Sequence, residues 1–191
     1  MTRKTNIIIL AVAIVFGTVL SANAQTKAFA KTLKLRGVTF IVKSPNKSTD
    51  NKVTITTRGL TRNATLVREV DGRITGAEVA DLNVDGFPEL YIYATSAGSG
   101  SYGSLVAFGS NKNKSLSDIF LPEIAAGSKE SIGFMGHDEF AVVEGTLVRR
   151  FPVYKPGDSN AKPTGGMRQI QYKLKAGEAG WVLYADKVVN F

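Results

Sequence analysis

Hydrophobic and polar residues alternate in short runs along most of the chain, which is the pattern of β-strands with one buried and one exposed face. Residues 53–57 and 65–70 show it clearly, and Asp71-Gly72 after the second run is typical of a hairpin turn. Short runs separated by turn residues favour an antiparallel arrangement. We expect roughly nine to eleven strands, among them residues 31–35, 38–42, 53–57, 65–70, 74–79, 89–94, 104–108, 138–143, 146–153, 167–174 and 181–189.

Helical patterns are scarce in this sequence. Residues 117–131 are the one stretch that could form a helix, and Pro122 and Gly127 would keep it short. There is no internal repeat of fixed period, and no linker-like composition divides the chain after its first 24 residues. The expected fold class is all-β: a single-domain antiparallel β-sandwich, or a flattened barrel, with at most one short helix.

The start of the chain has the pattern of an export signal. Two basic residues precede an apolar run at 7–20, and Ala22-Asn23-Ala24 forms a small-x-small cleavage site. A membrane anchor is the alternative, but the run is short for a bilayer span and ends in a cleavage sequence. We therefore predict a cleaved signal peptide, residues 1–24, and one exported domain, residues 25–191, which is periplasmic or secreted.

Composition narrows the function classes. Removing the two basic residues of the signal lowers the formal net charge from +8 to +6. The remaining basic residues are scattered and no aromatic RNA-binding signature accompanies them, so a solvated basic surface is expected in place of nucleic-acid binding. The sequence contains no cysteine, which excludes a disulfide framework and a lipid-modified cysteine at the cleavage site.

An acidic loop is the first candidate site. Asp81, Asn83 and Asp85 alternate, Gly86 follows, and Glu89 is the ninth residue of the pattern. Alternating oxygen side chains ahead of a glycine that permits a sharp turn are able to wrap a hard cation such as Ca²⁺. The equally open alternative is a turn rich in Asp and Asn that begins the next strand without a metal.

This acidic loop, residues 81–89, resembles the calcium loops of β-propeller repeats of the FG-GAP type. It departs from them in two ways, because the chain has a single copy and because Val84 stands where such loops usually carry glycine. It is not an EF-hand, since Ile92 occupies the twelfth position, where that motif requires a bidentate Glu.

A serine- and glycine-rich loop follows the strand at 89–94. Gly98 to Gly103 matches G-x-G-x-x-G, but a strand is expected after it, whereas a dinucleotide site requires a helix there. Neither Ser99 nor Ser101 lies in a G-x-S-x-G elbow, and the single histidine, His137, lies in a turn-like context. We therefore expect no enzyme activity and no required cofactor.

Recognition is the remaining interpretation of this loop. Serine and glycine make an adaptable hairpin tip with backbone donors, and a tyrosine adds contact area at low conformational cost. The export signal, the all-β pattern and Ser99-Gly100-Ser101-Tyr102 together resemble the periplasmic inhibitors of invertebrate-type (I-type) lysozyme. The resemblance is specific over residues 79–108 and is general elsewhere.

The resemblance implies a β-sandwich, often dimeric, whose Ser-Gly-x-Tyr loop blocks the lysozyme cleft. On this sequence the inhibitory loop is Ser99, Gly100, Ser101 and Tyr102. We hypothesise that the Ser99 hydroxyl and nearby amides donate hydrogen bonds to a carboxylate of the lysozyme cleft, while Tyr102 fills a sugar subsite. Arg149, Arg150 or Lys155 is a candidate for additional charge at the rim, although no motif supports the choice.

Two functions from different classes remain. The first is an exported lysozyme inhibitor, with I-type lysozyme as the favoured partner and a homodimer as an accompanying expectation. The second is a calcium-binding module of the cell envelope that uses Asp81, Asn83, Asp85 and Glu89 as metal ligands.

Overall fold

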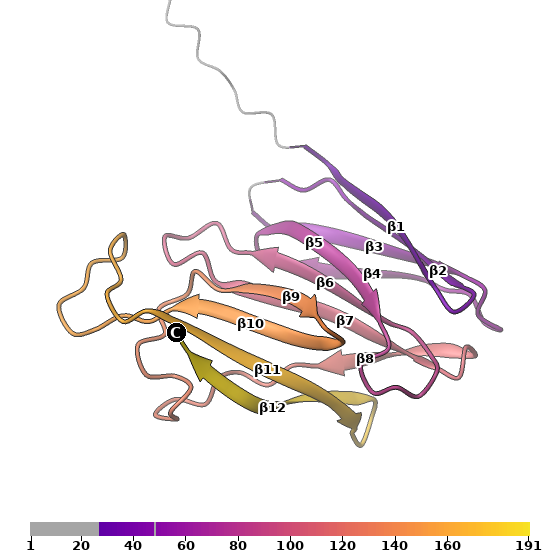
Figure 1. Cartoon of the computed structure of the whole chain (residues 1–191). Coiled ribbons are helices and arrows are strands. Elements are labelled where there is room, and N and C mark those ends of the chain that lie inside the picture. The colour runs from indigo at the N-terminus through magenta and orange to yellow at the C-terminus, as the bar shows by residue number, and fades with distance from the viewer. Residues whose placement is uncertain (1–26, 48) are drawn as a thin grey trace, which may run out of the picture.

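Twelve β-strands joined by turns and loops make up the computed structural model, which describes residues 27–47 and 49–191 (Figure 1). The signal peptide predicted for residues 1–24 lies outside the described residues. The strands are β1 (Phe29–Leu35), β2 (Val38–Ser44), β3 (Asn51–Arg58), β4 (Thr65–Val70), β5 (Arg73–Ala80), β6 (Glu89–Thr95), β7 (Gly103–Asn111), β8 (Ser115–Phe120), β9 (Glu139–Val143), β10 (Thr146–Pro152), β11 (Met167–Ala176) and β12 (Trp181–Asn190).

The expected helical stretch at residues 117–131 is not helical. Its first part belongs to β8, which pairs with β7, and turns and irregular backbone follow from Leu121 onward. Pro122 has no amide hydrogen to donate, so a helix would lack a bond at this point. No helix occurs anywhere in residues 27–47 and 49–191, which confirms the all-β class. Consequently, this part of the chain has no helix long and apolar enough to cross a membrane.

Two sheets make the fold. Strands β1 to β4 form a four-stranded antiparallel meander, and the other strands form an eight-stranded sheet in the order β5-β6-β7-β8-β12-β11-β10-β9. Within the larger sheet, β12 lies parallel to β8 through the pairs Trp181 with Ile119 and Val182 with Phe120. Every other neighbouring pair is antiparallel. The antiparallel expectation is thus confirmed, with one parallel pair that the pattern did not indicate.

The eight-stranded sheet curves until its two edge strands, β5 and β9, nearly meet (Figure 1). Glu78 on β5 bridges the gap. One of its carboxylate oxygens accepts a hydrogen bond from the Val142 amide on β9 at 2.8 Å and another from the Tyr93 hydroxyl at 2.6 Å. The sheet is therefore a nearly closed barrel, as the flattened-barrel expectation anticipated.

Strand β6 is buried on both faces and serves two hydrophobic cores. Its side chains alternate, so that Leu90 and Ile92 pack toward the four-stranded sheet, among Phe40, Ile55 and other residues. The opposite face of β6 contributes Tyr91 and Tyr93 to the barrel core, which the other strands of the large sheet complete. The strand that leads into the candidate loop is consequently held from both sides.

Candidate functional site

The loop that joins β6 to β7, residues 96–102, is called the tip below. Its two ends are tied together, because the Ser96 amide donates to the Tyr102 carbonyl and the Tyr102 amide donates to the Ser96 hydroxyl, both at 2.9 Å. Inside it, the Ser101 amide donates to the Gly98 carbonyl at 2.9 Å and closes a β-turn. The tip is therefore a closed hairpin turn with internal hydrogen bonds.

Two carbonyl groups of the tip are tied back to the rest of the protein. The Gly100 carbonyl accepts a hydrogen bond from the His137 amide at 2.6 Å. The Ser99 carbonyl accepts one from the side-chain amide of Asn160 at 2.7 Å. His137 follows Gly136, and Gly136 has φ +89° and would place a Cβ against the Gly100 carbonyl. Glycine at 136 is thus required for this close approach.

The hydrogen-bond donors of the tip, in contrast, are free to bind a partner. The backbone amides of residues 97–100 make no hydrogen bond within the described part of the chain, and neither does the Ser99 hydroxyl. Residues 97–99 are exposed. The Ser101 hydroxyl differs, because it lies 3.5 Å from the Gly98 carbonyl and faces the loop itself. The tip therefore offers donors to a partner while its acceptors at residues 98–100 are occupied.

Tyr102, the last residue of the tip, has one side of its ring supported and the other side open. The residue is 49% exposed, and its ring meets the Phe134 ring edge-on, with centroids 5.7 Å apart. Phe134 in turn packs edge-on against the buried Phe151 ring at 4.7 Å. A Cβ at Gly100 would collide with the Tyr102 ring, so the glycine of the Ser-Gly-x-Tyr pattern makes room for the tyrosine.

An open groove of about 600 Å³ borders Tyr102 on the side of β8 and the following loop. Phe120, which is 63% exposed, and Ile124 contribute apolar surface to it, and Ser104 and Glu123 contribute polar surface. The tyrosine therefore borders a groove with both apolar and polar parts.

A buried ion pair anchors the end of the tip. The Asp138 carboxylate accepts a hydrogen bond from the Gly103 amide at 2.8 Å and one from Arg149 Nε at 2.6 Å. The Arg149 guanidinium also lies over the rings of Phe134 and Phe140, at 4.9 and 5.3 Å from their centroids. Arg149 is 7% exposed, so its predicted role as a rim charge is wrong.

The two other basic residues proposed for the rim, Arg150 and Lys155, are exposed. The sequence did not indicate that Asp138, Phe134 and Asn160 belong to this site. The burial of Arg149 could have been predicted from the sequence. Arg149 lies two residues from both Leu147 and Phe151 along β10, and side chains two residues apart in a strand lie on the same face. No local signal links Asn160 to Ser99, since 61 positions separate them.

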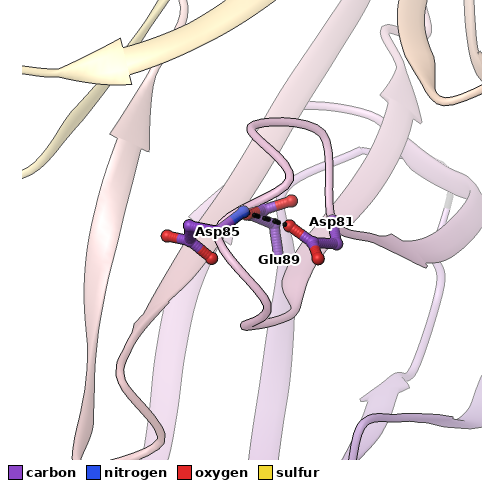
Figure 2. A group of neighbouring side chains, drawn as sticks. All are labelled: Asp81, Asp85 and Glu89. Atoms are coloured by element: carbon purple, nitrogen blue, oxygen red, sulfur yellow. Dashed lines mark hydrogen bonds between the residues drawn. The ribbon is translucent and has the colours of Figure 1, made fainter.

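The acidic loop, residues 81–89, lies at the other end of β6. One carboxylate oxygen from each of Asp81, Asp85 and Glu89 lies within 4.8 Å of the others (Figure 2). Asp81 accepts hydrogen bonds from the amides of Asp85 and Gly86, at 3.0 and 3.1 Å, and pairs with Arg36 at 3.0 Å. These bonds are those of a turn rich in Asp and Asn.

The side chain of Asn83 completes this turn. Its Oδ1 accepts a hydrogen bond from the Asp85 main-chain amide at 3.1 Å, and its Nδ2 donates one to the Asp85 carboxylate at 2.9 Å. Val84 between them has φ +56° and is 81% exposed. This left-handed conformation explains why glycine suits the position, and it makes Val84 a strained residue.

Glu89 is the buried member of the cluster, at 2% exposure. One of its carboxylate oxygens accepts a hydrogen bond from the Leu82 amide at 2.8 Å. Burial raises the pKa of the Glu89 carboxyl to about 8, the Leu82 amide opposes the rise, and the charges of Asp81 and Asp85 add to it. At neutral pH and without a cation, Glu89 is therefore mostly protonated.

We expect the stability of the calcium-free protein to fall as pH rises from 5 to 8, and Glu89→Gln to remove much of this dependence. Between about 4.3, the pKa of an exposed glutamate, and about 8, the folded chain holds a proton that the unfolded chain has released. The free energy of unfolding then decreases with pH, by up to about 1.4 kcal/mol per pH unit. Urea unfolding in chelator at several pH values measures this slope, and equal slopes for the variant and the parent would contradict it.

Together, the fold and the tip define an all-β protein that presents an ordered, donor-rich loop beside an exposed tyrosine, as a binding module does. The family model for the periplasmic lysozyme inhibitor of I-type lysozyme (PliI) matches residues 54–132, which confirms the resemblance. The matched range contains the acidic loop, β6 and the tip, but not Asp138, Arg149 or Asn160. No curated protein matches the chain. The family match supports a periplasmic lysozyme inhibitor.

Proposed function

We propose that this protein inhibits I-type lysozyme by inserting the tip, with Ser99, Gly100, Ser101 and Tyr102, into the active-site cleft of the enzyme. The family match supports the partner and the periplasmic location. The observation that carries the mode of inhibition is the availability of donors at residues 97–100, next to an exposed tyrosine. The protein acts by occupying the cleft and has no catalytic activity of its own.

The chemistry of a lysozyme cleft is complementary to such a tip. Two carboxyl groups flank the scissile bond, and an ionised carboxylate accepts several hydrogen bonds but donates none. The Ser99 hydroxyl and the amides of residues 97–100 supply donors, and hydrogen bonds to a charged acceptor are about twice as strong as neutral ones. Because the main-chain carbonyls of residues 98–100 are already paired, no unpaired carbonyl there opposes the enzyme's negative charge.

Tyr102 adds apolar contact area beside this polar interaction. In the proposed complex its ring fills a sugar subsite of the cleft, and the Phe134 contact limits its rotation before binding. A side chain that is already held loses less freedom on association, so more of the contact energy appears as affinity. The formal charge of +6 after signal cleavage gives no long-range attraction to a basic enzyme, so short-range contacts must supply the affinity.

The biological consequence is protection of the cell wall. An inhibitor placed in the periplasm, or released from it, meets lysozyme before the enzyme hydrolyses peptidoglycan. The protein would in this way reduce the effect of a host defence enzyme on the bacterium that exports it.

Titration of the purified protein into I-type, chicken-type and goose-type lysozymes tests this function, with lysis of peptidoglycan as the readout. We expect loss of activity of the I-type enzyme at a one-to-one ratio. No inhibition of any of the enzymes would refute the proposal. Sedimentation of the same samples tests the predicted homodimer.

Calcium binding by the acidic loop is a second candidate function. Asp81, Asp85 and Glu89 bring oxygens within 4.8 Å of one another, and Asn83 lies among them in the sequence. Glu89 also has a buried polar neighbour, because burial, the charge of Glu89 and a side-chain hydrogen bond to Glu89 all raise the pKa of the Tyr91 hydroxyl.

Calorimetry with CaCl₂ on chelator-treated protein measures this candidate directly. Binding should release heat or raise the melting temperature, and it should lower the pKa of Glu89 because a cation stabilises the carboxylate. Asp85→Asn should abolish the effect. The absence of heat and of any shift in melting temperature would contradict calcium binding. The proposed inhibition of lysozyme does not depend on that result.

A further inference from the structure

Asn160 lies in the polar loop between β10 and β11, residues 155–166, which is called the strap below. The Asn160 side chain joins three segments. Its amide nitrogen donates to the Ser99 carbonyl at 2.7 Å, and its oxygen lies 3.0 Å from Nε2 of His137. The Asn160 main-chain carbonyl accepts a hydrogen bond from the Tyr154 hydroxyl at 2.9 Å.

These contacts fix the orientation of the Asn160 amide. The Ser99 carbonyl can only accept, so the Asn160 group facing it must be the NH₂. The Asn160 oxygen therefore faces His137, and His137 must carry a proton on Nε2 to donate to it. Because the His137 main-chain amide binds the Gly100 carbonyl, the two residues hold adjacent carbonyls of the tip.

The strap is itself ordered, so it is able to hold the tip in place. Asp158 accepts hydrogen bonds from the amides of Lys155 and Thr164, at 2.7 and 2.8 Å, and from the Thr164 hydroxyl. These amide bonds hold the pKa of Asp158 below its ordinary value, so the carboxylate stays charged. At the base of the strap, the Val153 amide donates to the Gly166 carbonyl at 2.9 Å.

We infer that Asn160 is a positioning residue for the inhibitory tip, an inference that rests on the function proposed above. By pairing the Ser99 carbonyl, Asn160 turns this acceptor away from the partner and keeps the adjacent amides available. Without it, the carbonyl is free to rotate outward, where it would face a carboxylate of lysozyme and repel it. The family match ends at residue 132, before the strap begins. The tip, which lies inside the matched range, is therefore held by a residue outside it.

Asn160→Ala and Asn160→Asp test the inference. Aspartate keeps an acceptor for His137 but cannot donate to the Ser99 carbonyl, so both variants should raise the Kd for I-type lysozyme about ten-fold. Most of the change should appear as faster dissociation. Ser159→Ala, in the same loop and with a side chain that makes no hydrogen bond in the described residues, is the matched control and should bind like the parent.

Two further measurements separate positioning from a general loss of stability. Amide hydrogen exchange at Ser101 and Tyr102 of the free variants, whose amides are hydrogen-bonded within the tip, should accelerate, while the melting temperature should change by less than about 2 °C. In a Tyr102→Ala background, which already lacks the aromatic contact of the tip, Asn160→Ala should have a smaller effect than in the parent.

The outcomes distinguish the two proposals. If the parent inhibits lysozyme and Asn160→Asp binds as well as the parent, the positioning role is wrong and the inhibitor function stands. If exchange in the tip is unchanged in both Asn160 variants, the role is also wrong. If the parent inhibits no lysozyme, the proposed function fails, and accelerated exchange would still show that Asn160 orders the tip.

Discussion

Replacing Ser99 and Tyr102 together by alanine should raise the Kd for I-type lysozyme by about three orders of magnitude. Tyr102 is half exposed, and its ring is held on one side by Phe134 and bordered on the other by a partly apolar groove. Its truncation should cost about 2 kcal/mol or more, as is typical of an aromatic anchor at an interface. Loss of the Ser99 hydroxyl removes a donor to a charged acceptor, which is worth roughly 1.5–3 kcal/mol.

Inhibition assays and binding kinetics on the two single variants and the double variant measure these contributions. Tyr184→Ala, which removes a comparably exposed tyrosine from β12, is the matched control and should bind like the parent. Circular dichroism and melting temperature establish that the variants are folded. If both single variants inhibit as well as the parent, the assignment of the tip as the inhibitory loop is wrong.

Breaking the Asp138–Arg149 pair should produce the largest loss of stability. Asp138→Ala leaves the Arg149 guanidinium without its partner at a position that is 7% exposed. Removing one member of a buried ion pair typically costs about 3–5 kcal/mol, because the other charge remains buried and uncompensated. The Gly103 amide at the end of the tip also loses its acceptor, so the lysozyme affinity of the folded fraction should fall as well.

Urea unfolding followed by the fluorescence of Trp181 measures this loss of stability. Arg149→Met should also destabilise, and the double variant should lose less than the sum of the single variants, because neither charge is then left alone. Lys173→Ala, which breaks an exposed pair with Asp186, is the control and should cost less than about 1 kcal/mol. Additive losses in the double variant would show that the buried pair is not a coupled unit.

Most of the strands, but not β8, and the tip could be predicted because their signals are local. Period-two alternation marks β3 and β4, and the serine- and glycine-rich sequence after β6 marks a hairpin. The pairing of β12 with β8 could not be predicted, because it joins segments some 60 residues apart through only two residue pairs. The same limit applies to the support of the tip, since Asp138 and Asn160 come close to it only in the folded chain.

The acidic loop shows a different limit. Its spacing predicts a cluster of oxygens, and the structure places three of them together. Sequence spacing does not reveal that Arg36 pairs with Asp81, or that Glu89 is buried deeply enough to have its pKa raised to about 8. Whether such a loop favours a cation depends on these surroundings, which arise from other strands.

The double burial of β6 has a consequence for cooperativity. Leu90 and Ile92 belong to one core and Tyr91 and Tyr93 to the other, so neither core is able to open without exposing a face of this strand. The two sheets should therefore unfold in a single transition, without a populated state in which one of them has melted. Since the tip continues directly from β6, it should keep its binding geometry up to that transition, and inhibitory activity and fold should be lost at the same temperature.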